Sequence, residues 1–582
     1  MKLLLTRPGK YTGKTLLEEP AVAMVMLINE QSIFFEPGSV RNKPVEYYNR
    51  LLNNLFSDFL LKKYGSRSAL AQAWTGVSGQ CDLKADEDPA KGNVRPMQLD
   101  DFKSTPPDGA PRLRHKDSVE FLKITQVKYY ESMRQYLEKL GCKVPIGGTN
   151  IVYDVPELET HLAMDYTSQN FYHEIGEISD NGTVYKWKNL PLTKVDLLSS
   201  ARPTCESAVA AVKLKALPVT STELDDMWPS EWRSSFMVSI AAVSALQDWD
   251  AMFQFCYMGG WNYDWNMADK TRIIQNSTVE FNDPAIMGVF PASALLYHRR
   301  DVSPAKNVVQ VVYQGQDHLL QCSGLRDAVF PFNYLPFVSR VESSIGSFAA
   351  PASVLLAPVR PDFGNTGSAP LYMQYDRFAK KTTNAASREL DAAMKKAGLL
   401  KPEYGIQGDS VVSDNGELTR DWKKGLITIN TSRSQGFTGF VANEWISLKD
   451  VAIRSKTSFA TIIVSSLDNS PLSKSSRMLL TAVSRAENDT DKIEYGNTVK
   501  EASGTVRGER MKLTRGKDGK VMVEIVNAEI RLKYPKVKVT SLAPDMSAAA
   551  PSYEVSAVDG VATVSIGVKS PPSIWYLLET GN

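Results

Sequence analysis

The sequence predicts an α/β protein, with a parallel α/β sheet or barrel in its first half and sandwich-like all-β domains at its C-terminal end. Over roughly the first 300 residues, short apolar runs alternate with amphipathic stretches of helical period, as in parallel strands joined by crossover helices. From about residue 417, β-rich segments are separated by turns, which is typical of antiparallel sandwiches. We expect an α/β domain over 1–305, a mixed α+β linking region over 306–435 and β-sandwich accessory domains over 436–582.

The elements of the first half can be assigned in order. A buried strand is expected at 21–28, directly before Asn29 and Glu30. A helix over 118–140 has a capping box formed by Asp117 with Glu120 and a stop at Gly141. Later apolar runs predict strands at 143–149, 162–166, 217–222 and 252–257, and helices at 237–246 and 284–298. The carboxyl ends of such parallel strands are where ligands bind.

The second half is predicted to be mainly strands. One amphipathic segment, 387–397, predicts a helix. Strands are expected at 308–313, 330–341, 426–430, 459–466, 477–484, 521–530 and 561–568. These are short apolar segments bounded by turn residues, so they favour antiparallel sheets.

Charge and hydropathy exclude two classes of partner. The chain carries 67 Lys and Arg against 65 Asp and Glu, a net charge of +2, so no basic excess is present to neutralise nucleic acid. The longest clean apolar run, 21–28, is far shorter than the about 20 residues of a spanning helix, so we expect no membrane segment. The N-terminal residues show no secretory signal peptide.

Metal and disulfide chemistry are also not expected. The five cysteines are widely spaced, the nearest two being Cys205 and Cys256, and there are only five histidines. This spacing supports neither a disulfide framework nor a metal site, and no cofactor motif is present. If the protein is an enzyme, carboxylates are therefore the expected catalysts.

Two glutamates stand at strand ends. Glu30 and Glu223 each follow an apolar run that predicts a strand, and in a barrel such ends converge on one face. Two opposed carboxylates are what glycoside hydrolysis requires. The alternative for either residue is a helix cap or an ion-pair partner. Asn443 and Glu444 repeat the dipeptide in the β-rich region, where we interpret it as a turn.

The contexts of these glutamates resemble clan A glycoside hydrolases, the (β/α)8 retaining enzymes that include the family-five cellulases and mannanases. Val25-Met-Leu-Ile-Asn29-Glu30 resembles their fourth strand, and Pro218-Val-Thr-Ser-Thr-Glu223 resembles their seventh. Weaker resemblances are those of 163–173 to the sixth strand, and of 247–257 with Trp261 to the eighth strand and its platform tryptophan.

The resemblance implies roles for individual residues. Glu30 would be the general acid/base, Glu223 the nucleophile and Asn29 a ligand of the sugar 2-hydroxyl. Tyr172 could hydrogen-bond Glu223, and Trp261 would stack on a sugar ring; core packing is the alternative for both. Further substrate-binding candidates are Asp165, Trp228 and Tyr257.

The chain departs from the family pattern at its start. Only five strands are predicted before residue 258, and they correspond to the fourth to eighth, so the fold implied is an incomplete TIM-type barrel. The long insertion over 31–142, or a second subunit in a homo-oligomer, would have to cover the exposed strand edges.

The resemblance implies a retaining glycoside hydrolase, xylanase- or cellulase-like, acting on a β-linked plant-type polysaccharide such as β-1,4-xylan, glucan or mannan. It would use two glutamates in a double displacement and need no cofactor. Two alternatives are open: a non-catalytic carbohydrate-binding or scaffold protein on a degenerate barrel, and a fragment that requires a partner. An extracellular or periplasmic location is expected of the class.

Overall fold

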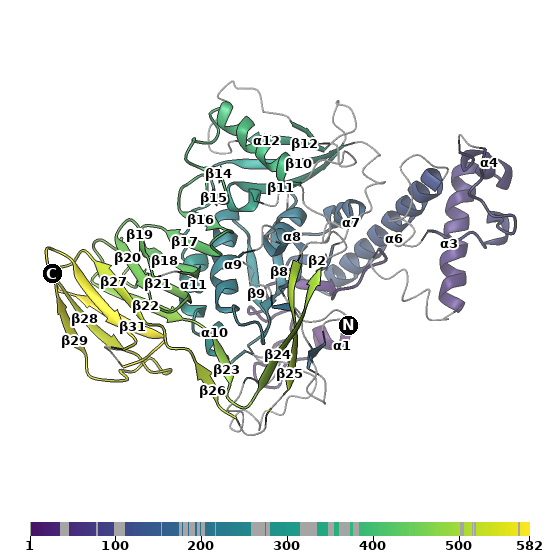
Figure 1. The fold of residues 1–582 in the computed structure, drawn as a ribbon. Coiled ribbons are helices and arrows are strands. Elements are labelled where there is room, and N and C mark those ends of the chain that lie inside the picture. Colours follow the sequence, from purple (N-terminus) through teal and green to yellow (C-terminus); the bar gives the residue numbers. More distant parts are fainter. Residues whose placement is uncertain are drawn as a thin grey trace.

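The computed structural model describes most of the chain, and the account that follows is confined to the described part. That part comprises residues 2–34, 46–76, 79–97, 111–152, 154–173, 177–178, 184–185, 193–194, 198–199, 204–215, 217–257, 274, 280–314, 334–346, 354–359, 373–375, 383–441, 443–500, 506–514, 516, 519–568 and 571–581. Figure 1 shows the parallel strands in the middle of the molecule and the large C-terminal sheets on one side.

Parallel strands form an open arc in the first half. β1 (Val25–Ile28) pairs with β2 (Ile146–Thr149), and a bridge between Gly147 and Tyr166 leads from β2 toward β3. β3 (Thr167–Ser168) and β4 (Phe171–His173) pair in succession with β8 (Val219–Asp226), which pairs with β9 (Ala251–Gln254). All these pairings are parallel. Within the described pairings β1 contacts only β2 and β9 only β8, so a closed TIM barrel is not seen.

The strand positions agree with the apolar runs at four of the five predicted places. The exception is 162–166, where the 3-10 helix η2 (His161–Ala163) overlaps the start of the predicted range and the strand begins at Thr167. Parallel strands are buried on both faces and so appear in sequence as short apolar runs. In the predicted range the apolar Leu162 belongs to the 3-10 helix, where it is 49% exposed, so the apolar run alone did not locate the strand.

Two glycines let aromatic rings pack closely on β2. A Cβ built on Gly147 would lie 2.3 Å from the Tyr166 ring, and one built on Gly148 would lie 2.6 Å from the Tyr130 ring. The Tyr130 hydroxyl also accepts a hydrogen bond from the Thr149 amide at 3.2 Å. Any side chain at either position would therefore push away a ring that holds a neighbouring element against the strand.

The 31–142 insertion has two parts. α6 (Pro111–Lys139) leads directly into β2 and is longer than the predicted helix. α3 (Glu46–Tyr64), α4 (Arg67–Ala73) and the 3-10 helix η1 (Pro89–Lys91) pack around their own core with the start of α6. Figure 1 shows α3 and α4 projecting at the far end of α6, away from β2. β1 shares its hydrophobic cluster with Tyr130 and Leu137 of α6, and also with Leu5 and Leu17 of the N-terminal segment, which includes α1 (Lys2–Thr6).

Helices α7 (Val155–Thr160), α8 (Thr204–Val212), α9 (Ser234–Gln247), α10 (Pro284–Met287) and α11 (Phe290–His298) follow the parallel strands. α9 confirms the predicted helix at 237–246, whereas the predicted helix at 284–298 is divided into α10 and α11. All 14 residues of α9 are buried. The helix contacts β8 and also β18 and β21 of the C-terminal sheet, so it is a central layer between two sheets.

A small mixed sheet and a helix make up the middle region. β10 (Val308–Gln314) is parallel to β11 (Arg340–Gly346) and antiparallel to β12 (Val354–Val359), which pairs with β13 (Met373–Tyr375). The 3-10 helix η5 (Leu335–Phe337) precedes β11, and α12 (Thr383–Lys396) lies just before the first strand of the large sheet.

The C-terminal region contains a ten-stranded sheet whose pairings are all antiparallel. Its strands, in spatial order, are β14 (Gly405–Gln407), β15 (Ser410–Val412), β16 (Leu418–Asp421), β17 (Leu426–Asn430), β18 (Ser434–Phe440), β21 (Phe459–Ser466), β22 (Arg477–Val483), β31 (Trp575–Thr580), β28 (Lys536–Ser541) and β29 (Tyr553–Ser556). β17 pairs with β18, so this sheet crosses the domain boundary expected at 435.

A second, four-stranded sheet packs against part of the first. It contains β19 (Trp445–Ser447), β20 (Val451–Ser455), β27 (Ala528–Leu532) and β30 (Ala562–Ile566). The two sheets share one hydrophobic core, which is consistent with the predicted β-sandwich. The remaining strands are β5 (Glu177–Ile178), β6 (Val184–Tyr185), β7 (Thr193–Lys194), β23 (Ala486–Asn488), β24 (Lys492–Lys500), β25 (Val506–Thr514) and β26 (Val521–Val523).

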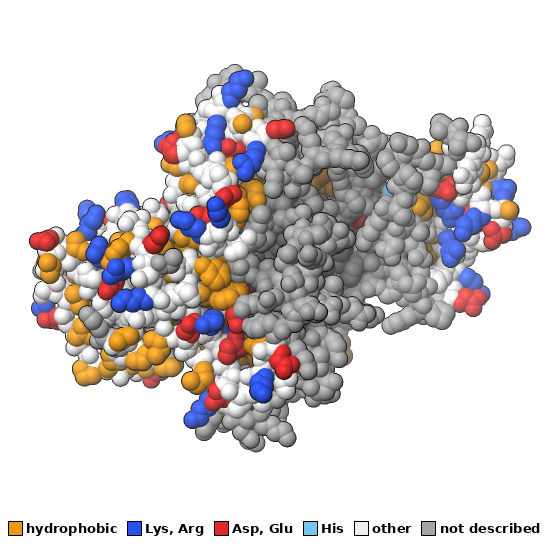
Figure 2. Space-filling model, in the orientation of Figure 1, with side chains coloured by type: hydrophobic (Ala, Val, Ile, Leu, Met, Phe, Trp, Pro, Cys, Tyr) orange, Lys and Arg blue, Asp and Glu red, His pale blue; other side chains and the backbone are white. Residues whose placement is uncertain are grey.

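The surface carries both signs of charge. On the described part of the face in Figure 2, basic and acidic side chains are interspersed among apolar ones. Within the described ranges, none of the helices has the length and apolar character needed to cross a membrane.

Candidate active site

Polar side chains gather where the parallel strands end. Asn29 and Glu30 follow β1, Asn150 follows β2, and Asn170 lies between β3 and β4. Glu223 is within β8, at a register shift between Ser221 and Leu224 in the pairing with β9. Such irregularities re-aim side chains at the rims of sheets and next to active sites.

Burial along β8 singles out Glu223. Six of the eight residues of this strand are buried, and the two that are only partly buried are Thr222 and Glu223. Glu223 is therefore the carboxylate of β8 that reaches solvent, whereas Asp225 and Asp226 on the same strand are almost wholly enclosed.

Asn150 connects three of these residues. Its Oδ1 accepts a hydrogen bond from the Glu30 backbone amide at 2.6 Å. Its Nδ2 donates to Asn29 Oδ1 at 2.8 Å and to Thr222 Oγ1 at 2.9 Å. Thr222 Oγ1 in turn donates to Asn170 Oδ1 at 2.8 Å. The chain of contacts thus links the ends of β1 and β2 to β8.

Asn170 joins the two glutamates. Its Nδ2 donates to Glu30 Oε1 at 2.9 Å, and the same side chain lies close enough to Glu223 to lower the pKa of that carboxyl. The Tyr172 hydroxyl donates to Glu223 Oε2 on the other side. The two carboxyls, 193 residues apart in sequence, are therefore neighbours across one amide, as the convergence of strand ends predicts.

The electrostatics of Glu223 reflect opposing effects. Burial raises the pKa of Glu223 above its usual value, and the nearby charge of Glu30 acts in the same direction. Hydrogen bonds from Tyr172 and Asn170 lower the pKa but do not outweigh burial. The pKa of Tyr172 is raised by burial and by Glu223, so the phenol stays protonated and acts as a donor.

A second group of carboxyls lies behind the site. Gln254 Nε2 donates to Asp225 Oδ1 at 2.8 Å and to both Glu280 oxygens at 2.7 Å. Burial raises the pKa of Asp225 well above its usual value and that of Glu280 to about 7. Two buried carboxyls on one amide favour a single shared proton. Next to them His173 Nδ1 lies 3.1 Å from Asp226 Oδ1.

The structure places two predicted ligand residues elsewhere. Asp165 accepts a hydrogen bond from the Ile146 amide at 2.8 Å and pairs with Arg134 at 2.9 Å, at the amino end of β2 and so opposite Glu30. Trp228 is 2% exposed, and its Nε1 donates to Glu487 at 3.2 Å within a core cluster. In the structure Asp165 ties strand starts together, and Trp228 packs inside the protein, so neither joins the group around Glu30 and Glu223.

The remaining predicted residues divide as follows. Asn29, Glu30, Tyr172 and Glu223 belong to the connected group described above. Tyr257 lies just beyond β9, is 63% exposed and packs against Phe281 with ring centroids 6.2 Å apart. Trp261 lies outside the described residues.

Sequence reasoning missed Asn150, Asn170 and Thr222 as members of the site. Thr222 directly precedes Glu223, and Asn170 stands two residues before Tyr172, so their positions beside predicted residues were a usable signal. Asn150 directly follows the predicted strand at 143–149, and its place at a strand end was the signal for that residue.

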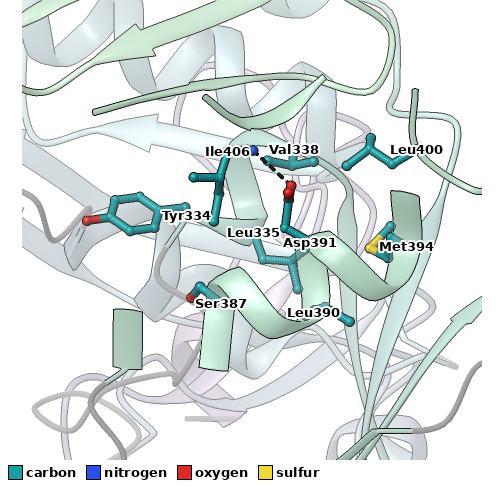
Figure 3. A pocket seen from close by; sticks show the side chains of 9 residues that line it. All are labelled: Tyr334, Leu335, Val338, Ser387, Leu390, Asp391, Met394, Leu400 and Ile406. Atoms are coloured by element: carbon teal, nitrogen blue, oxygen red, sulfur yellow. Dashed lines mark hydrogen bonds between the residues drawn. The ribbon is translucent and has the colours of Figure 1, made fainter. Parts of the chain in front are cut away.

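Within the described residues, no group of three or more His, Cys, Asp or Glu side chains is placed to hold a metal ion. A cavity between α12 and the η5 segment has a volume of about 20 Å³ and a mainly apolar lining (Figure 3). That volume is enough for about one water molecule and far below the few hundred Å³ of a ligand pocket.

Comparison with known proteins gives little. No family model matches the chain, and no curated protein matches it. Among solved structures, similarity is found to a polyextremophilic β-galactosidase from the Antarctic haloarchaeon Halorubrum lacusprofundi, with 11% identity, coverage of 88% of this chain and 75% of that chain, and a TM-score of 0.29. This likeness is too distant to carry an argument about fold or activity.

Proposed function

We propose that the protein is a retaining glycoside hydrolase that cleaves a β-linked plant-type polysaccharide such as xylan, glucan or mannan. The observation that carries the proposal is that Asn170 binds Glu30 and lies beside Glu223, which accepts a hydrogen bond from Tyr172. Two carboxyls side by side, one of them held by a phenol donor, match the requirement of this chemistry.

In the proposed mechanism the Glu223 carboxylate attacks the anomeric carbon while the glycosidic C–O bond breaks. Glu30 donates its proton to the leaving oxygen, and a covalent glycosyl-enzyme forms. Water then attacks the same carbon and releases Glu223, while Glu30 takes up the proton of the water. Asn29 is exposed and adjacent to Glu30, so it could contact the sugar. Tyr257 is a weaker candidate for contact with the polymer.

The first test is release of reducing sugar from β-glucan, xylan, mannan and galactan. Wild type should release sugar from at least one polymer, and Glu30→Gln and Glu223→Gln should each lower the rate by at least about 100-fold. Glu444→Gln is the matched control, because it changes the same dipeptide at an exposed site and should keep wild-type activity. Full activity in Glu223→Gln would remove the proposed nucleophile.

Azide separates the two roles. In Glu30→Ala, azide can replace water in the second step and should give a glycosyl azide of retained configuration from an activated aryl glycoside. In Glu223→Ala, azide should take the place of the nucleophile and give the inverted product. Glycan binding without hydrolysis of any substrate would instead favour a non-catalytic binding protein.

A further inference from the structure

Asn150 is a buried amide that holds the segment carrying Glu30. Its exposed fraction is 0%, so it cannot be a ligand contact itself. Its three hydrogen bonds reach the Glu30 backbone, the Asn29 side chain and Thr222. We propose that Asn150 is a positioning residue for the acid/base step: it holds Glu30 in its backbone conformation and orients the Asn29 amide toward the ligand. This inference rests on the proposed function.

The backbone of Glu30 needs such support. Its φ is +51°, in the left-handed region that residues with a side chain rarely adopt. A residue keeps such a conformation when its surroundings over-determine it. The 2.6 Å hydrogen bond from the Glu30 N–H to Asn150 is a direct tie at this point. Asn170 holds the other end of the residue, the carboxyl, at 2.9 Å.

The same amide decides what Asn29 presents to a ligand. Because Asn29 Oδ1 accepts from Asn150 Nδ2, the amide nitrogen of Asn29 is left for the exposed side. Asn29 should therefore donate hydrogen bonds to an acceptor oxygen, such as a sugar hydroxyl. Loss of Asn150 would free the Asn29 amide to rotate as well as release Glu30.

A leaving-group comparison tests this role. Two aryl β-glycosides of the sugar found in the polymer panel are used, one with phenol and one with 2,4-dinitrophenol as leaving group. Phenol needs the proton of Glu30 to leave, whereas dinitrophenolate leaves without it. In Asn150→Ala, kcat/KM should fall about 100-fold on the phenyl glycoside and only a few-fold on the dinitrophenyl glycoside.

A second variant and a control keep the test decisive. Asn150→Leu keeps the approximate size of the side chain but can neither accept from the Glu30 amide nor donate to Asn29. The ratio of the dinitrophenyl to the phenyl kcat/KM should therefore rise as it does in Asn150→Ala. Asn307→Ala removes another buried asparagine, which binds Leu399 and Asp414 outside the site, and should leave the ratio unchanged. Melting curves show that each variant is folded.

The outcomes are distinguishable. A raised ratio of the dinitrophenyl to the phenyl kcat/KM in both Asn150 variants supports the inference. Equal losses on the two glycosides, or no loss, overturn it while the proposed function stands. A wild type that hydrolyses neither glycoside nor any polymer overturns the proposed function, and the positioning role falls with it.

Discussion

At the scale of single residues, the contact between Tyr172 and Glu223 is the most informative. Burial raises the pKa of Glu223, and the hydrogen bond from Tyr172 lowers it. The carboxylate must be ionised to attack, so the acid side of the activity profile should follow this pKa. A carboxyl with a raised pKa loses its charge at a higher pH than an ordinary glutamate does.

Tyr172→Phe should therefore move the acid limb of kcat/KM to higher pH, by about one unit. The reason is that the variant removes a donor that favours the charged form while burial remains. The measurement is the pH profile of kcat/KM in both proteins. Tyr166→Phe is the matched control, because Tyr166 is a buried tyrosine whose hydroxyl binds the Val25 carbonyl at 3.0 Å, away from Glu223. An unmoved limb in Tyr172→Phe would contradict the assignment of Glu223.

At the scale of elements, the end of β8 and the segment after β9 meet through buried carboxyls. Burial raises the pKa of Glu280 to about 7 from 4.5. Between these values the folded protein binds more protons than the unfolded chain, so stability falls as pH rises through this range. Protonation of Glu280 thus favours the folded state at acid pH.

Glu280→Gln should reduce the loss of folding stability as pH rises. Glutamine resembles a protonated carboxyl and cannot ionise. The stability of the variant minus that of wild type should therefore be larger at pH 8 than at pH 5. Urea midpoints at the two values provide the measurement. Glu487, whose pKa burial also raises to about 7, contributes a fall of the same sense, so some slope remains. Glu444→Gln, which changes an exposed side chain, should keep the wild-type slope.

Elements also explain which sequence predictions succeeded. Apolar runs located β1, β2, β8 and β9, because strands buried on both faces need such runs. Asp165 was misplaced because the predicted strand at 162–166 would have ended beside it, whereas the observed strand begins at Thr167. A displacement of five residues moved Asp165 from the carboxyl end of a strand to the amino end.

Other features were beyond the reach of local patterns. Trp228 could stack on a sugar or pack inside the protein, and its burial is decided by contacts with Ala486 and Glu487, more than 250 residues away. The large sheet extends across the boundary expected at 435, because β17 and β18 form a hairpin there. Turn residues locate strands but do not say which sheet they join.

At the scale of the whole molecule, the two halves share one core. The main cluster of buried residues includes Val219 of β8, α9 and α11, and also Ile427 and Phe459 of the ten-stranded sheet. A buried pair adds to it, since Arg233 binds Asp283 at 2.6 Å and the Ala486 carbonyl at 2.6 Å. Part of the hydrophobic core of residues 1–305 is therefore supplied by the ten-stranded sheet of the C-terminal region.

Residues 1–305 expressed alone should fail to fold cooperatively. Removing the C-terminal sheet would expose one side of α9, all of which is buried in the full chain. The measurement is calorimetry together with binding of a hydrophobic dye, and the full chain serves as the control. A sharp melting transition in the isolated fragment, with little dye binding, would contradict a shared core.

The burial of α9 has a consequence for synthesis on the ribosome. The helix leaves the exit tunnel well before β21, which begins at Phe459 and covers it. At about 5–20 residues per second, the roughly 200 intervening residues take about 10–40 s to be made. During that interval the nascent chain displays an uncovered apolar helix, so a chaperone that binds such segments should raise the yield of folded protein.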